Sequence, residues 1–76
     1  PTLLNIFGLR FYFYLDEHLP IHVHISNGGQ KAKIALEPEV GIIYNHGLKE
    51  KEIKKALDTC RTYKDNFIKE WHKRFD

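Results

Sequence analysis

The stretch "IHVHISNGGQKAKIALE" (residues 21–37) decides the fold, because it has the pattern of two β-strands joined by a tight turn. Apolar and polar residues alternate over 21–26 and again over 31–37, as they do in a strand with one buried face. "NGG" at 27–29 is typical of a hairpin turn. The stretch therefore predicts an antiparallel hairpin with Ile21, Val23 and Ile25 on the buried side and His22 and His24 on the other.

Two more strands are predicted before this hairpin. "TLLNIF" (2–7) and "RFYFYL" (10–15) flank Gly8 and Leu9, which mark a second hairpin turn, and the aromatic residues of 10–15 favour a strand. "DEHLP" (16–20) is polar and ends in proline, so it is predicted to connect two strands. "PEVGIIYNHG" (38–47) contains a short apolar segment that is a candidate fifth strand, and its last glycine ends the strand-rich half of the chain, 1–47.

The second half of the chain, 48–76, is predicted to be helical. Apolar residues recur there at steps of three and four, which places them on one stripe of a helix. One continuous helix over about 49–75 would keep the stripe intact, whereas a break near "KDN" (64–66) would give two helices; a helix of about 27 residues is long for so small a domain, so length favours a break or bend. The stripe is interpreted as core and consists of Ile53, Ala56, Leu57, Cys60, Tyr63, Phe67, Trp71 and Phe75.

Together these patterns predict one α+β domain over residues 1–76. Its four- to five-stranded, mostly antiparallel sheet would have one face covered by one long or two shorter C-terminal helices, which leaves the other face to solvent. On the second strand Phe11, Phe13 and Leu15 share the apolar side, so their neighbours must point the other way. The open side is then expected to collect Arg10, Tyr12, Tyr14, His22, His24, Lys31 and Lys33.

Composition limits the class of protein. The net charge of +2 does not by itself indicate a polyanion partner, and the nine basic and six acidic side chains of 48–76 are interpreted as a solvated helix face. The single cysteine, Cys60, cannot form an internal disulfide. No apolar run approaches the roughly 20 residues of a membrane span. We therefore expect a cytoplasmic protein without a membrane partner.

Nucleic-acid contact, with RNA before DNA, is the first function that the predicted open side suggests. Tyrosine and histidine rings can stack on unpaired bases, and arginine and lysine can neutralise phosphates. An ordinary solvated sheet face is the alternative, since tyrosine and lysine are common there. The residues expected to bind are Tyr12, Glu17, His18, Lys31 and Lys33.

Metal-free ribonuclease chemistry on the same side is an alternative, so whether the protein is an enzyme stays open. RNA cleavage needs a base for the 2′-hydroxyl proton, an acid for the leaving oxygen and cations for the charge on phosphorus, and a pair of histidines titrates near neutrality. In that mechanism His22 and His24 would be the acid–base pair. Arg10 would stabilise the phosphate charge, and Tyr14 would orient or stack.

A divalent-metal site is a further alternative, although the sequence predicts no cofactor outright. Two histidines at i and i+2 on a strand point the same way, roughly 6.5–7 Å apart, and this spacing suits two imidazole ligands to Zn²⁺ or another divalent ion. The metal candidates are His18, His22 and His24, with Glu17 as an alternative third ligand from the preceding loop.

Three segments of the chain resemble one protein family. "LNIFGLRFYFYLDEHLPIHVHI" (4–25), "KAKIALEP" (31–38) and "EWHKRF" (70–75) are similar to segments of the small prokaryotic proteins of the domain of unknown function 4160 family. Those proteins typically carry an R-x-x-x-Y strand, an E-H-x-P-P-H-x-H-V string and a C-terminal helix with a Trp near its end. Ile21 departs from this pattern, because the family usually has a second proline there. The matching positions are Arg10, Tyr14, Glu17, His18, Pro20, His22, His24 and Trp71.

The resemblance implies a partner more than it implies a reaction. The family has no established biochemical activity, and its members resemble parts of toxin–antitoxin-like gene pairs, beside another small protein. By analogy this favours an RNA target or a cognate small protein as the partner, with a homo-oligomer as an alternative. The aromatic residues and Arg10 on the predicted open side are also typical of a protein interface.

Overall fold

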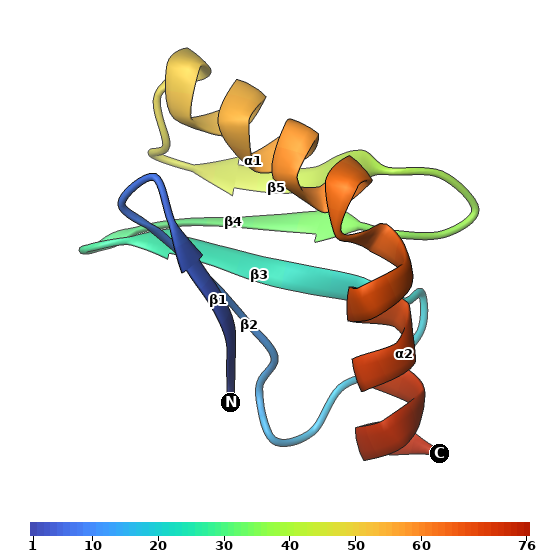
Figure 1. The fold of residues 1–76 in the computed structure, drawn as a ribbon. Coiled ribbons are helices and arrows are strands. Elements are labelled where there is room, and N and C mark those ends of the chain that lie inside the picture. Colours follow the sequence, from blue (N-terminus) through green and yellow to red (C-terminus); the bar gives the residue numbers. More distant parts are fainter.

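Five strands form one antiparallel sheet in which neighbours along the chain are also neighbours in space, in the order β1-β2-β3-β4-β5 (Figure 1). The computed structural model describes residues 1–76 and confirms the predicted α+β class, with two helices after the sheet. The third and fourth strands are the hairpin expected from 21–37. The strands are β1 (Thr2–Ile6), β2 (Leu9–Tyr12), β3 (His22–Asn27), β4 (Gln30–Ala35) and β5 (Gly41–His46).

Two tight turns set the register of the sheet. The β3–β4 turn falls at the predicted "NGG", where Gly28 has φ 62° and so adopts a conformation that glycine takes without steric cost. The β1–β2 turn is made by Phe7 and Gly8, one residue earlier than expected, and both have positive φ, 56° and 74°. The β2 strand ends at Tyr12 instead of continuing to Leu15, so the connection before β3 is longer than the predicted 16–20.

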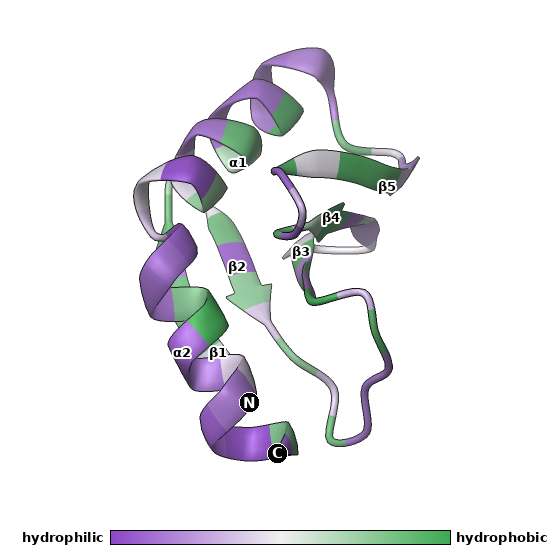
Figure 2. Ribbon diagram, turned by 90° about the vertical axis from the view of Figure 1, so that its right-hand side faces the viewer, coloured by the Kyte–Doolittle hydropathy of each residue, from purple (hydrophilic) through white to green (hydrophobic).

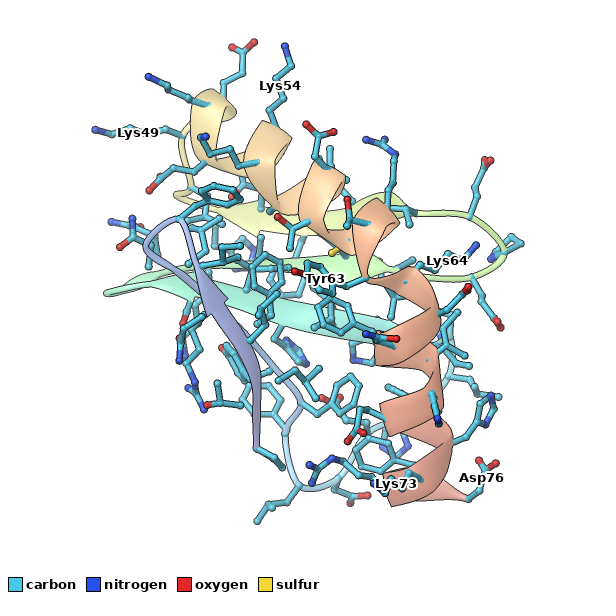
Figure 3. All side chains as sticks on the ribbon, viewed as in Figure 1. Lys49, Lys54, Tyr63, Lys64, Lys73 and Asp76 are labelled. Carbon is cyan, nitrogen blue, oxygen red and sulfur yellow. The ribbon has the colours of Figure 1, made fainter.

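The helical half consists of two helices, α1 (Glu50–Thr62) and α2 (Lys64–Phe75), joined at Tyr63. The break lies beside the predicted "KDN" and lets the apolar stripe follow the sheet in two directions, with α1 along β5 and α2 turned down beside β1 and β2 (Figure 1). Neither helix has the length and the apolar run that crossing a membrane requires. Figure 3 shows Tyr63 beneath the bend and Lys54 on the outer side of α1.

The core lies between the helices and one side of the sheet, where the apolar bands of both helices face the strands (Figure 2). Phe11 stacks on Phe67 with ring centroids 5.9 Å apart, and Phe13 meets Trp71 edge to face at 5.5 Å. Ile21, Val23 and Ile25 are buried in this layer, as predicted. The core comprises Leu9, Phe11, Phe13, Ile21, Val23, Ile25, Ala32, Ile34, Leu36, Leu48, Ile53, Ala56, Cys60, Phe67 and Trp71.

Candidate functional site

The side of the sheet that faces away from the helices carries two rows of side chains across strands β2 to β5. Directly paired residues of an antiparallel sheet point to the same side, so each row is continuous. His24 stacks on Tyr12 with centroids 5.5 Å apart, and the Arg10 guanidinium lies 4.2 Å from the centre of the Tyr12 ring. We call this side the open face; its rows are Arg10, Ser26, Lys31 and His46, and Tyr12, His24, Lys33 and Tyr44.

Two aromatic residues of the open face were not predicted from the sequence. Tyr44 and His46 stack on each other, with ring centroids 4.3 Å apart and planes at 17°. The β4–β5 register shifts between Lys33 and Ile34, so the side to which β5 residues point could not be counted from the turn. The one available signal was the spacing of Tyr44 and His46, which are two residues apart and therefore share a face of any regular strand.

The charge on the open face is positive. The five strands contain Arg10, Lys31 and Lys33 but no Asp or Glu. Arg10 and Lys31 are exposed and Lys33 is half-buried. The exposed part of this face therefore presents cations and aromatic rings to solvent without neutralising carboxylates from the strands.

One carboxylate reaches this side of the sheet from the loop between β2 and β3. Glu17 Oε1 lies 2.9 Å from His22 Nε2, and Glu17 Oε2 lies 3.0 Å from His24 Nε2. The donor atoms of the three side chains all lie within 4.8 Å of one another. His22 is 1% exposed, His24 is 4% exposed, and the Glu17 side chain is 6% exposed. We call this group the Glu17–His22–His24 cluster.

Backbone groups of the loop fix the orientation of the cluster. The amide of Tyr14 donates a hydrogen bond of 2.7 Å to Glu17 Oε2. His22 Nδ1 lies 2.7 Å from the carbonyl oxygen of Pro20, and because a carbonyl only accepts, this nitrogen carries a proton. His22 Nε2 and Glu17 Oε1 share a proton in a 2.9 Å hydrogen bond, so Nε2 is the ring atom that becomes free for a ligand when this proton leaves.

His24 has no equivalent partner. Its Nε2 is close to Glu17 Oε2, but the orientation of the two groups does not satisfy hydrogen-bond geometry, and this buried nitrogen has no other partner. Burial lowers the pKa of His24 and favours the neutral ring, although the nearby Glu17 carboxylate acts in the opposite direction. A neutral His24 thus keeps an unpaired ligand atom inside the cluster.

The electrostatics of Glu17 favour its charged form. Burial raises the pKa of this carboxyl, but the hydrogen bond from the Tyr14 amide, followed by the charges of His24 and His22, outweighs burial and holds the pKa below its usual value. The cluster is therefore a carboxylate facing two imidazole nitrogens, a set of groups that can hold either a shared proton or a metal ion.

Aromatic rings enclose the cluster. The Tyr14 ring lies 4.2 Å from the His24 ring, measured between centroids, and the Trp71 indole lies 5.2 Å from the His22 ring. Burial raises the pKa of Tyr12 to about 12, with Tyr14 as a further cause, so Tyr12 stays a neutral phenol at physiological pH. Trp71, to which the sequence assigned only a core role, thus also contacts the cluster.

The expected exposure of three residues is wrong. Tyr12, His22 and His24 point to the open face as predicted, but they are buried because the loop that carries Glu17 and Tyr14 folds over them. His18, a sequence candidate for the third metal ligand, is exposed and outside the cluster, and Glu17 takes its place. The directions of strand residues follow from alternation, whereas the path of this loop does not.

Comparisons with known proteins give a family but no characterised relative. A family model described as a domain of unknown function (DUF4160) matches residues 8–72, which include all of the cluster and both rows of the open face. No curated protein and no solved structure matches the chain. The match confirms the resemblance inferred from the motif-bearing segments and assigns no activity.

Proposed function

This chain belongs to the DUF4160 family, a domain of unknown function, and we propose that it binds single-stranded RNA through the open face of its sheet. The observation that carries the proposal is the absence of Asp and Glu from all five strands, beside the cations Arg10, Lys31 and Lys33. Phosphates are attracted to such a face, and most of the affinity of non-specific nucleic-acid binding comes from this attraction.

Aromatic rings at the edges of the cationic rows favour a single strand over a duplex. The stacked pair of Tyr44 and His46 lies at the β5 end of the face, and the half-exposed Tyr14 lies beside His24 of the central strand. Unpaired bases stack on such rings, whereas the bases of a duplex are already stacked on each other.

Ribonuclease chemistry by His22 and His24 receives less support. Both rings are enclosed by Glu17, Tyr14 and Trp71, so neither can reach a phosphodiester while the loop lies over them. Arg10, the residue expected to stabilise phosphate charge, donates from Nε to Thr2 Oγ1 at 2.8 Å but remains exposed. The open face is therefore proposed as a binding surface.

The test is a fluorescence-anisotropy titration with a labelled, unstructured RNA oligonucleotide at several salt concentrations. Three phosphate contacts on a single strand give a slope of log K against log salt of about −2. Single-stranded DNA and double-stranded RNA of the same length are the comparison ligands, and we expect the duplex to bind more weakly. Binding that is absent, or that does not change between 50 and 200 mM salt (about fourfold in concentration), would contradict the proposal.

A second candidate is docking of a cognate small protein, as in a toxin–antitoxin-type pair, against the edge strand β5. Ile42 and Ile43 are both exposed on this strand, and Ile43 lies at the register shift where it has no partner on β4. An edge strand with exposed apolar residues can accept a strand from another chain. Co-expression with the product of the neighbouring gene tests this: Ile43→Lys should abolish co-purification, and a partner retained by that variant would place the interface elsewhere.

A further inference from the structure

We infer that the Glu17–His22–His24 cluster binds one divalent first-row transition-metal ion, which fastens the β2–β3 loop to the sheet. Three ligand atoms of the required kinds converge here, two imidazole nitrogens and one carboxylate oxygen, within 4.8 Å of one another. Imidazole ligands favour ions such as Zn²⁺, Co²⁺ or Fe²⁺ over Mg²⁺ and Ca²⁺, which prefer an all-oxygen shell.

The donor spacings fit ligands on one ion. Glu17 is 2.9 Å from His22 Nε2 and 3.0 Å from His24 Nε2. Two ligands about 2.1 Å from a metal lie roughly 3.0 Å apart at adjacent octahedral positions and roughly 3.4 Å apart in a tetrahedron. Each Glu17 oxygen and its histidine therefore have the spacing of adjacent ligands on a six-coordinate ion. The ligand atoms of the cluster lie within 4.8 Å of one another, and any pair wider than about 4.2 Å, twice the metal–ligand distance, has to close when one ion binds.

The hydrogen bond at His22 Nδ1 is of the kind that orients metal-ligating histidines in proteins. A ligating histidine almost always donates its other ring N–H to a carbonyl or carboxylate, which fixes the tautomer and the ring plane. His22 Nδ1 makes such a bond with the Pro20 carbonyl at 2.7 Å, and Glu17 is held in the same way by the Tyr14 amide. Both ligands are thus positioned by backbone groups of the loop.

The second, independent observation is the unpartnered nitrogen of His24. A buried polar atom without a partner is rare, because its desolvation is not compensated. His24 Nε2 is such an atom: it lies 3.0 Å from Glu17 Oε2 but makes no hydrogen bond. A metal ion within bonding distance of both histidines would satisfy it, which a proton shared by Glu17 and His22 would not.

The contacts of the β2–β3 loop indicate that a bound ion would hold the loop against the sheet. Phe13 and Ile21 anchor the two ends of the loop in the core, but Leu15 is 90% exposed and Leu19 is 77% exposed, so apolar packing does not hold the middle of the loop. Glu17 contributes the inward contacts that join the middle of the loop to β3. A bound ion replaces the proton between Glu17 and His22 with one bond to Glu17 and two to the histidines of β3, and the loop is then fixed to the strand.

The experiment is isothermal titration of tag-free, chelator-treated protein with Zn²⁺ and with Co²⁺, and Mg²⁺ as the hard-ion control. We expect one ion per chain with a Kd of about 1 µM or tighter. At a free Zn²⁺ concentration about 100 times Kd, the Tm should rise by about 10–20 °C. The absence of both heat and a Tm shift with Zn²⁺ and Co²⁺ would overturn the inference.

Variants separate this site from adventitious binding. Glu17→Gln keeps a side chain that can hydrogen-bond to the Tyr14 amide and to His22, so it should stay folded, yet it should weaken Co²⁺ binding by at least about tenfold. His24→Ala should do the same, whereas His18→Ala, one residue from Glu17 but outside the cluster, should leave the Kd unchanged. Undiminished binding by folded Glu17→Gln would also overturn the inference. RNA binding by the open face is measured separately and does not depend on this result.

Discussion

The indole of Trp71 meets the imidazole of His22 edge to face, with ring centroids 5.2 Å apart and planes at 64°. The same indole also packs against Phe13, with ring centroids 5.5 Å apart, and against Phe75 at 4.8 Å. One side chain of α2 therefore contacts both the apolar core and the polar cluster on β3. Changes at Trp71 should affect stability and the cluster together.

Replacement of Trp71 by alanine should destabilise the domain by about 3–5 kcal/mol, because it removes a large buried side chain from a thin core. The free energy of unfolding of a domain of this size is roughly 4–11 kcal/mol in total. Trp71→Phe retains an aromatic ring and is therefore the variant that should stay folded. Urea denaturation followed by far-UV circular dichroism measures both. His72→Ala, at the exposed neighbouring position, should change stability by less than about 1 kcal/mol. If it lost as much stability as Trp71→Ala, the effect would not be specific to the Trp71 side chain.

Replacement of Glu17 by alanine should release the loop between β2 and β3. In metal-free protein the change removes the acceptor of the Tyr14 amide and leaves the buried His22 without its partner, and the loss at His22 costs about 1–3 kcal/mol. Chymotrypsin should then cleave faster after Tyr14 or Leu15, both of which are already exposed. Asp16→Ala removes a neighbouring exposed carboxylate and should cleave at the wild-type rate. Equal cleavage of the two variants would mean that Glu17 does not hold the loop.

Strand directions could be predicted from the sequence because alternation is a local property. The parity of 21–26 and 31–37 places Val23, Ile25 and Ile34 in the core, and the structure agrees. The two-helix break at Tyr63 could only be anticipated from length, since no glycine or proline marks it.

The candidate site could be predicted only in part, because it depends on contacts between segments. The alternation of β3 predicts that His22 and His24 share a side of the sheet. Their burial depends on how the Phe13–Ile21 connection crosses the sheet, and no local pattern specifies that path. Glu17 was an alternative third ligand beside His18; choosing between these adjacent residues requires the backbone bonds to the Tyr14 amide and the Pro20 carbonyl.

The buried thiol of Cys60 should make the domain less stable at alkaline pH. Burial raises the pKa of Cys60 from 9.0 to about 12, so the folded protein keeps the neutral thiol while the unfolded chain ionises. The stabilising contribution is fully present below pH 9 and is lost as the pH rises toward 12. At pH 11 (about two units above the unfolded pKa) the loss is about 2–3 kcal/mol.

The measurement compares the free energy of unfolding in urea of wild type and Cys60→Ala at several pH values between neutrality and about pH 11. Above roughly that pH, the ionisation of other side chains dominates stability. Other groups titrate equally in the two proteins, so the difference between them isolates Cys60. Wild type should be more stable at neutral pH because of better packing, and this advantage should shrink or reverse at high pH. A difference that stays constant with pH would show that the thiol is not shielded from ionisation.

Lys31 and Lys54 are a matched pair for locating the RNA-binding surface, since each is an exposed lysine and they lie on opposite sides of the molecule. Lys31 is in the first row of the open face, and Lys54 points outward from α1 (Figure 3). Either change to glutamine lowers the net charge by the same amount. If the open face contacts phosphates, Lys31→Gln should weaken RNA binding about two- to tenfold at low salt and reduce the salt slope by about 0.7, because one fewer counterion is released. Lys54→Gln should do neither. Equal effects of the two variants would mean that RNA responds to net charge alone, and a larger effect of Lys54→Gln would move the binding surface to the helices.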